Sequence, residues 1–199
     1  MVKRFQIILV LLGAAVVLPF ITGMYPTVTF PREYIDVHVY PDHVSVEGRY
    51  VYKNPFPFPV LQGFHYPLPV DEKHPMTEGV YAEVLEPERK VVPIKHIFEK
   101  FLFEVWFRGR EESTILVMYD QLSLDRTGTY IITSTKEWKN PLNYALYRIF
   151  PHGVKLISSN YALTSHKTGY QSFERKDFMP EEDWHFTWEL ITEHKGEAE

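Results

Sequence analysis

The sequence predicts an all-β fold, an antiparallel β-sandwich of about ten short strands preceded by one N-terminal apolar helix. Three observations support this class. Apolar and polar residues alternate with a period of two after Met24, and turns rich in Gly, Pro, Asn and Asp separate the alternating stretches. No window in that part of the chain has helical periodicity over three turns. Aromatic residues, which favour half-buried pleated surfaces, make up 16% of the chain.

Two predicted hairpins are the clearest elements. Residues 35–39 alternate between apolar and polar side chains, and after a short turn the alternation resumes over 44–52. In the same way, residues 101–107 alternate and residues 113–121 return after a polar turn. Each pattern predicts two paired strands with one buried face. Further strands are expected at residues 129–135, 144–150, 154–163 and 184–190.

The proline-rich stretch 54–69 predicts a stiff connection between strands. Asn54 and Pro55 end a strand, because proline lacks the backbone donor that a sheet needs. A strand is expected to resume at Gly63 and to stop at Pro67. The only helical segments expected after Met24 are short, near 136–145 and 180–184.

The N-terminus indicates export or anchoring. Lys3 and Arg4 precede an apolar run from Phe5 to Thr22, which is typical of a signal peptide or a signal anchor. The positive-inside rule places the N-terminus in the cytoplasm and the rest of the chain outside the membrane, either held there through residues 5–24 or secreted after cleavage. The predicted divisions are a signal segment at 1–24, a tether at 25–32, the sandwich domain at 33–193 and a charged tail at 194–199.

Composition excludes several classes of site. The chain has no cysteine, so a disulfide framework, a thiolate zinc site and a cysteine nucleophile are impossible. The net charge of −5, without a basic stripe, argues against nucleic-acid binding. Because the sequence also lacks a phosphate-binding glycine loop, no cofactor is predicted.

Short motifs in the first two thirds of the chain resemble a known domain type. They are GRYVYKNP from Gly48, HYPLP from His65, EESTILVMY from Glu111 and WKNP from Trp138. In this order they resemble the β-sandwich of VIT-type domains (vault protein and inter-alpha-trypsin inhibitor), and also secreted bacterial β-sandwich domains of unknown function, over residues 34–141. The resemblance implies the sandwich fold and no activity or site residues.

Two histidines form the best local candidate for a metal site. His38 and His43 flank the first hairpin turn, with Asp36 and Asp42 nearby. Imidazole is a common ligand of zinc and copper, but two ligands without a third are a weak pattern, and solvated hairpin residues explain the spacing better. We therefore predict no metal.

An acidic cluster is the candidate for chemistry. Its members are Asp177, Glu181, Glu182, Asp183 and His185. Paired carboxylates serve glycosidases, and carboxylate oxygens bind calcium. The alternative is the first turn of a short helix, where carboxylates meet the positive end of the helix dipole.

Two tryptophans are candidates for a sugar-binding platform. Trp106 falls on the polar side of its alternating strand, and Trp138 is expected in a turn, whereas Trp184 and Trp188 fall on an apolar face and are expected in the core. Packing against a neighbouring strand is the alternative for both candidates.

Together these patterns indicate a protein that binds rather than catalyses. The expected partner is an envelope protein, reached through an exposed strand edge. The competing interpretation is a secreted carbohydrate-active or hydrolytic protein that uses the cluster from Asp177 to His185. A pocket that joins those carboxylates to a tryptophan would favour the enzyme, and an exposed edge or apolar patch would favour the binder.

Overall fold

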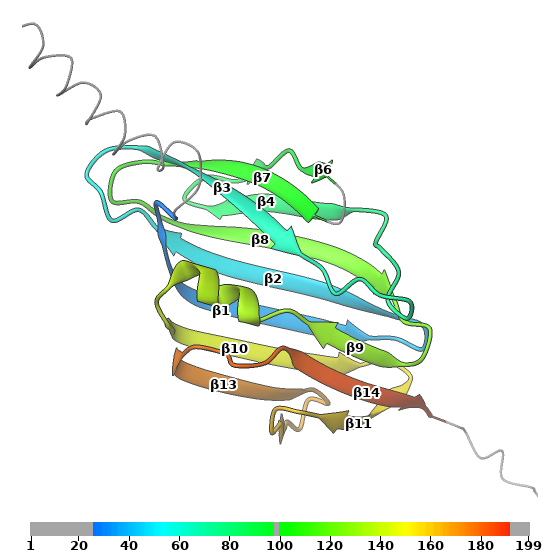
Figure 1. The fold of residues 1–199 in the computed structure, drawn as a ribbon. Helices are drawn as coiled ribbons and strands as arrows, with labels where there is room; N and C mark the ends of the chain where they lie inside the picture. The colour runs from blue at the N-terminus through cyan, green and yellow to red at the C-terminus, as the bar shows by residue number, and fades with distance from the viewer. Residues whose placement is uncertain (1–25, 98–99, 192–199) are drawn as a thin grey trace, which may run out of the picture.

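The computed structural model describes residues 26–97 and 100–191, and this part of the chain is almost entirely β (Figure 1). The largest sheet has the strand order β12 (Thr164–Ser165), β13 (Gln171–Phe178), β10 (Leu142–Pro151), β1 (Thr29–Val39), β2 (His43–Lys53), β8 (Glu112–Leu122), β4 (Val80–Glu86) and β5 (Lys90–Val91). One three-stranded sheet contains β3 (Val60–Pro67), β7 (Lys100–Phe107) and β6 (Lys95–Ile97). Another contains β11 (Val154–Ser159), β14 (Trp184–Leu190) and β9 (Thr127–Tyr130). The 3₁₀ helix η1 (Thr133–Trp138) follows β9.

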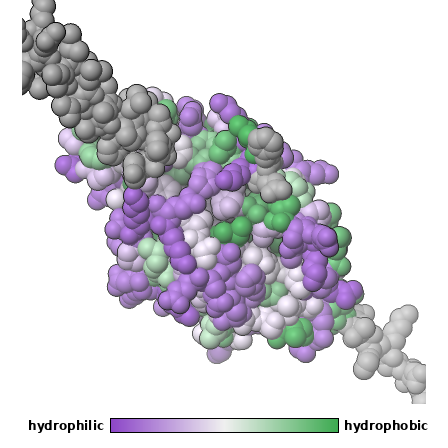
Figure 2. Space-filling model, viewed as in Figure 1, coloured by the Kyte–Doolittle hydropathy of each residue, from purple (hydrophilic) through white to green (hydrophobic). Residues whose placement is uncertain are grey.

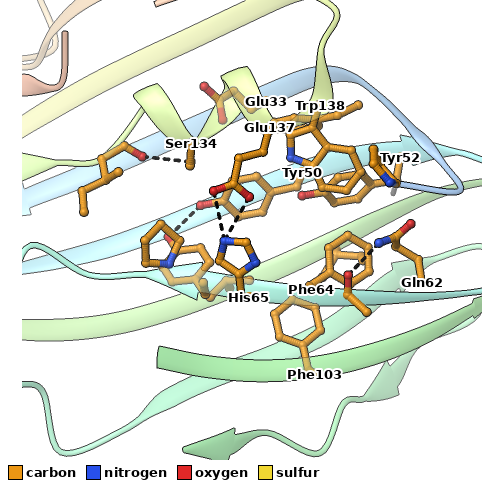
Figure 3. Close-up of a pocket in the computed structure, with 18 of the residues that line it drawn as sticks. Glu33, Tyr50, Tyr52, Gln62, Phe64, His65, Phe103, Ser134, Glu137 and Trp138 are labelled. Carbon is orange, nitrogen blue, oxygen red and sulfur yellow. Dashed lines mark hydrogen bonds and ion pairs between the residues drawn. The ribbon is translucent and has the colours of Figure 1, made fainter. Parts of the chain in front are cut away.

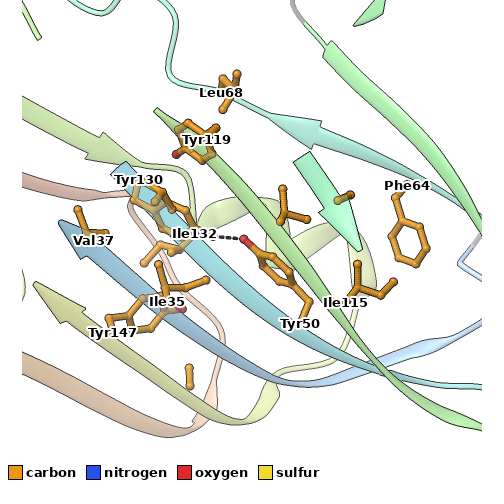
Figure 4. Close-up of a cluster of buried hydrophobic side chains, with 14 of the residues drawn as sticks. Ile35, Val37, Tyr50, Phe64, Leu68, Ile115, Tyr119, Tyr130, Ile132 and Tyr147 are labelled. Atoms are coloured by element: carbon orange, nitrogen blue, oxygen red, sulfur yellow. Dashed lines mark hydrogen bonds between the residues drawn. The ribbon is translucent and has the colours of Figure 1, made fainter. Parts of the chain in front are cut away.

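Both small sheets pack on the same face of the large sheet (Figures 1 and 4). From β2, the Tyr52 ring contacts Phe64 of β3 with ring centroids 4.7 Å apart. From β10, the Tyr147 ring meets Trp184 of β14 at 5.9 Å. Tyr147 lies beside Ile35 of β1, which in turn lies beside Gly48 of β2, so these inward side chains share one face. The fold is therefore all-β and sandwich-like, with one continuous core.

The first predicted hairpin is confirmed. β1 and β2 pair antiparallel, with Val39 opposite Val44 and Val37 opposite Val46. All four valines are buried. The period-two pattern therefore gives both the strands and the buried face correctly, because adjacent antiparallel strands share the apolar side of the pleat.

The second predicted hairpin is wrong. Both of its strands exist, as β7 and β8, but β7 belongs to a small sheet and β8 lies between β2 and β4 in the large one. Residues 108–111 carry the chain from one layer to the other instead of reversing it within a sheet. Alternation shows that a strand has one buried face, but it does not show which strand lies next to it in the sheet. Two consecutive strands can therefore bury their apolar faces against each other from different layers instead of pairing in one sheet.

The large sheet is mixed rather than wholly antiparallel. β1 pairs parallel with β10, for example Ile35 with Tyr147 and Asp36 with Arg148. Parallel neighbours require a long crossover, and here the crossover includes most of the domain. On the outer face of this pair, Arg148 donates two hydrogen bonds to the Asp36 carboxylate, at 2.6 and 2.5 Å.

The proline-rich stretch begins with an interlayer crossing, as its turn chemistry predicts. Residues 54–59 connect β2 to β3, and they lie against the crossing that joins β7 to β8. Asn54 is fully buried, and its side-chain amide donates to the backbone carbonyls of Phe58 and Arg108, both at 2.8 Å. A Cβ on Gly109 would lie 2.1 Å from the Pro57 carbonyl oxygen, so the two crossings touch through backbone atoms.

The predicted short helices need correction. The helical turn η1 begins three residues before the expected range 136–145, and Leu142 to Ala145 belong to β10 instead. Residues 180–184 form no helix, because this segment runs in bends directly into β14. Of the predicted tether 25–32, residues 29–32 belong to β1, and Val28 and Phe30 are buried.

The predicted signal segment, residues 1–24, and the charged tail, 194–199, lie outside the described residues. Within residues 26–97 and 100–191, the structure contains no helix with the length and apolar character needed to cross a membrane.

Candidate functional site

The main candidate site is a pocket of about 330 Å³ between the large sheet and the elements β3 and η1 (Figure 3). Residues of β1, β2 and β8 line it from the large sheet, and residues of β3, β7 and η1 line the other side. The residues of the large sheet that line the pocket lie on the same face of their strands as the core residues. The period-two pattern that builds the core therefore also builds this pocket.

Glu33 is the buried acid of the pocket. It lies two residues before Ile35, in phase with the inward side chains of β1, and is only 3% exposed. The Tyr147 hydroxyl donates a hydrogen bond to its Oε1. Burial raises the pKa of Glu33 from its usual 4.5 to about 7, because the charged form loses its hydration, and the Tyr147 hydrogen bond offsets only part of this effect. A carboxyl group that titrates near neutrality inside a pocket is a candidate functional group.

Three tyrosine hydroxyls form a polar cluster beside this acid. The Tyr50 hydroxyl lies 2.7 Å from that of Tyr66 and 2.6 Å from that of Tyr130. Gly48 leaves space for this arrangement, since a Cβ there would lie 2.2 Å from the Tyr50 hydroxyl oxygen. Burial raises the pKa of Tyr66 to about 12, so its hydroxyl stays protonated at neutral pH. Burial also raises the pKa values of Tyr50 and Tyr130 well above the usual value, and the Glu33 carboxylate adds to this effect.

Aromatic rings form the remaining walls. Trp138 of η1 packs near three other rings, with centroid distances of 5.0 Å to Tyr52, 5.6 Å to Phe30 and 5.9 Å to Phe64. Phe64 in turn stacks on Phe103 at 5.0 Å. Such rings supply apolar surface and negative ring faces to a ligand.

A contact between a histidine and a carboxylate joins η1 and β3 at one side of the pocket (Figure 3). His65 Nε2 lies 3.0 Å from Glu137 Oε2 and 3.2 Å from Oε1, and both side chains are substantially exposed. Nearby, the Gln62 side chain accepts hydrogen bonds from the Thr27 backbone N–H at 2.7 Å and from its hydroxyl at 2.9 Å. This side chain fastens the start of the described chain beside the pocket.

The two candidate tryptophans lie in different environments. Trp138 is partly buried and lines the pocket, as described above. Trp106 is 68% exposed on the outer face of β7, opposite Leu61 of β3 in the strand register. Trp184 and Trp188 are buried in the core, as expected from their apolar face.

The acidic cluster does not contribute to the pocket that Trp138 lines. Its carboxylates are absent from the described lining of the pocket, and Asp177, Glu181 and Glu182 are exposed. Asp183 has a structural contact: its Oδ1 accepts a hydrogen bond from the Thr133 backbone N–H at 2.9 Å, at the start of η1. His185 contacts the Thr129 hydroxyl through Nδ1 at 2.9 Å.

The histidines of the first hairpin turn have separate partners. His38 Nδ1 lies 2.9 Å from His152 Nε2, whereas His43 Nδ1 lies 2.7 Å from Asp42 Oδ1. Burial and the neighbouring His152 lower the pKa of His38. Among the described residues, no group of three or more His, Asp or Glu side chains is arranged to hold a metal ion.

Glu33 and the tyrosine cluster are site residues that the sequence interpretation missed. A signal for Glu33 was available, since it is a carboxylate in phase with Ile35, Val37 and Val39 on an otherwise apolar strand face. The tyrosine cluster has no such local signal, because its members come from strands separated by up to 80 positions. Chemically, the pocket offers a buried acid, a cluster of tyrosine hydroxyls and a largely aromatic wall.

Comparison with known proteins supports the fold. No protein-family model matches the sequence, and no curated protein matches it. Among solved structures, a candidate nutrient binding protein from Legionella pneumophila is similar, with a TM-score of 0.65 at 10% identity over 82% of this chain and 67% of that one. An M1 zinc metallopeptidase from Deinococcus radiodurans matches with a TM-score of 0.46 at 8% identity, over 81% of this chain and 42% of the peptidase chain. At these identities the likeness is one of fold.

Proposed function

We propose that this protein is a non-catalytic, extracytoplasmic binding protein whose pocket beside Glu33 holds a small organic ligand. The observation that carries the proposal is the pocket itself, about 330 Å³ in volume, with a buried acid and convergent hydroxyls among aromatic walls. Small-molecule sites have this composition, mostly apolar surface with a few polar groups that orient the ligand. The extracytoplasmic location rests on the N-terminal sequence, where two basic residues precede an apolar run.

Catalysis has weaker support. The predicted hydrolase would use the cluster from Asp177 to His185, and those side chains are spread over a surface segment away from the described pocket lining. Asp183 supports η1 through the Thr133 backbone. The Legionella protein is described as nutrient binding, and at 10% identity its likeness carries the shape of the domain but not its ligand.

An envelope protein partner is the second candidate function. Trp106 and Leu61 face outward next to each other in the β3–β7 register, with exposed fractions of 68% and 37%. Figure 2 shows apolar residues scattered among hydrophilic ones on the face that carries this sheet. Exposed aromatic anchors of this kind are favoured at protein interfaces.

The proposal is tested by filling the pocket. Ser134 of η1 lines it, so Ser134→Phe should occupy part of its volume, and Ser165→Phe on the exposed strand β12 is the matched control. Full-length protein in mild detergent is screened by thermal shift against a panel of small metabolites. A compound present at about 100 times its Kd should stabilise the fold by about 2.7 kcal/mol, or roughly 5–10 °C in Tm.

We expect that shift in the unmodified protein and in Ser165→Phe, and its loss in Ser134→Phe. Circular dichroism establishes that both variants are folded. Equal shifts in both variants would place the ligand elsewhere, and no shift from any compound would remove the support for a small-ligand protein.

A further inference from the structure

We propose that the ligand is an organic cation, with its ammonium group against the Glu33 carboxylate and its remaining atoms among the aromatic walls. This inference rests on the proposed function above and names the chemical class of its ligand. It is carried by the charges, the rings and the size of the pocket.

The ionisable residues of the pocket favour a cation. Its described lining includes two carboxylates, Glu33 and Glu137, and one histidine, His65, but no lysine or arginine. His65 and Glu137 pair with each other at 3.0 Å. Glu33 has Tyr147 as its one hydrogen-bond partner among the described residues, and that bond is made at Oε1. A buried carboxylate without a cationic partner is costly, so a ligand that brings a positive charge gains more there than in water.

The rings favour the same ligand. Eight aromatic side chains line the pocket, and their faces attract a cation through the negative part of the ring quadrupole. The hydroxyl oxygens of Tyr50, Tyr66 and Tyr130 are additional acceptors for an N–H group. The eight residues are Phe30, Tyr50, Tyr52, Phe64, Tyr66, Phe103, Tyr130 and Trp138.

The volume restricts the ligand to a small molecule. About 330 Å³ is near the lower end of the range of roughly 300–1,000 Å³ found for ligand pockets. An amine with a short aliphatic or aromatic body fits this size. A long peptide chain would extend beyond it.

Cation binding should be linked to proton release. Burial raises the pKa of Glu33 to about 7, so at neutral pH part of the population carries a proton that a bound cation displaces. The groups around Glu33 are Tyr147 from β10, the tyrosines of the pocket, and the His65–Glu137 pair. The tyrosine pKa values lie above neutrality, so the change in affinity between about pH 5 and pH 7 that Glu33→Gln removes is the contribution of Glu33. We expect that contribution to rise by up to about tenfold per pH unit and to level off above pH 7.

The experiment uses matched probes that differ in charge. Choline is compared with its neutral analogue in which carbon replaces nitrogen, and phenethylamine is compared with phenethyl alcohol. Calorimetric titration on full-length protein in a neutral detergent is carried out at about pH 6 and about pH 8, and titrations in buffers of different ionisation heat report the protons released. The variants are Glu33→Gln and, as a control, Glu72→Gln, whose side chain is exposed.

We expect at least one cation to bind about tenfold more tightly than its neutral partner at pH 8, with the preference lost in Glu33→Gln and kept in Glu72→Gln. The amide oxygen introduced by Glu33→Gln would still accept the Tyr147 hydrogen bond, so loss of the preference with unchanged circular dichroism reports the charge rather than unfolding. Equal binding of cation and neutral partner overturns the cation proposal and leaves the small-ligand function standing. No binding of either cation also overturns it, and the Ser134→Phe screen then decides the proposed function separately.

Discussion

The Tyr147 hydroxyl donates a hydrogen bond to Glu33 between two strands that lie side by side and run parallel. Tyr147 stands opposite Ile35, so it reaches diagonally to the acid two residues earlier on β1. Tyr147, on the large sheet, is the only hydrogen-bond donor to Glu33 among the described residues. The part of the Glu33 carboxyl group that lines the pocket can therefore contact a ligand. The same hydrogen bond therefore joins β1 to β10 and orients the acid of the candidate site.

Replacing Glu33 should change how stability depends on pH. Its pKa is higher in the folded state, about 7, than the usual 4.5, so the folded state binds the proton more tightly and the fold loses stability as pH rises from about 4.5 to 7. The difference corresponds to about 3 kcal/mol as an order of magnitude. Glu33→Gln should therefore be more stable than the unmodified protein at pH 8, by about 1–3 kcal/mol, with little difference near pH 4. Urea unfolding at several pH values measures this, and an equal loss of stability at both pH values would contradict it.

Asn54→Ala should destabilise the two interlayer crossings. The substitution removes two donated hydrogen bonds, to the carbonyls of Phe58 and Arg108, and one accepted from the Phe56 backbone N–H at 2.9 Å. With the side chain buried, we expect a loss of about 2–4 kcal/mol in the free energy of unfolding. Asn143→Ala, at an exposed position of β10, is the matched control and should change stability by less than about 0.5 kcal/mol. Equal effects of the two substitutions would show that the crossings are not held by Asn54.

Asp183→Ala should loosen η1 and, through it, the pocket. Its carboxylate accepts the Thr133 backbone N–H, and no side chain of the preceding residue Ile132 caps the helix. Loss of such a cap costs about 1 kcal/mol. Asp183→Asn keeps an acceptor oxygen and should recover most of that stability. The exposed neighbour Glu182 provides the control Glu182→Ala in urea unfolding, and a loss of stability there as large as that in Asp183→Ala would contradict the capping role of Asp183.

Arg148→Lys should weaken the pairing of β1 with β10. Arginine makes two hydrogen bonds to Asp36, at 2.6 and 2.5 Å, and lysine keeps the charge but cannot reproduce this fork. Because Asp36 is only 8% exposed, we expect a loss of about 1–2 kcal/mol, measured by urea unfolding. Arg89→Lys changes the exposed arginine of a pair with Glu83 and should cost less than about 0.5 kcal/mol. A loss at position 89 as large as that at 148 would contradict the assignment.

Trp106→Phe should remove the most accessible tryptophan fluorescence. Trp184 and Trp188 are buried, Trp138 is partly buried, and Trp106 faces solvent. We expect a lower acrylamide-quenching slope, a blue shift of the emission and a stability change below about 0.5 kcal/mol. Unchanged quenching would mean that Trp106 is already covered in the full-length protein, by a second copy or by the detergent.

Most of the long strands were predictable from sequence, but β4 and β13 were missed, and residues 133–135 of the predicted strand 129–135 belong to η1. The predicted pairing of β7 with β8 was also wrong. Alternation in residues 35–39 and 44–52 correctly predicts β1 and β2, because a tight turn leaves antiparallel pairing as the simplest arrangement. The same reasoning fails for β7 and β8, where contacts with the crossing at residues 54–59 draw the chain into the other layer. Those contacts join residues more than 50 positions apart, and no local pattern encodes them.

The candidate site was less predictable than the fold. Trp138 was selected for its expected exposure and instead forms a pocket wall with Tyr52 and Phe30. Glu33 lies on the same side of β1 as the apolar residues Ile35 and Val37, so its burial could have been predicted from the sequence. Its hydrogen bond to Tyr147 could not, because the two residues are 114 positions apart. A pocket formed by several strands depends on the order of strands in space, which alternation does not specify.

The parallel pairing of β1 with β10 also bears on how the chain folds. β1 is synthesised first and lies inside the large sheet, yet one of its two neighbours becomes available only after residues 142–151 have emerged. Until then its free edge is exposed while β2 and later strands form, and contacts of such high sequence separation slow folding. A chain that stops before β10 would keep that edge open, and strand exchange between such chains is the expected route to aggregation.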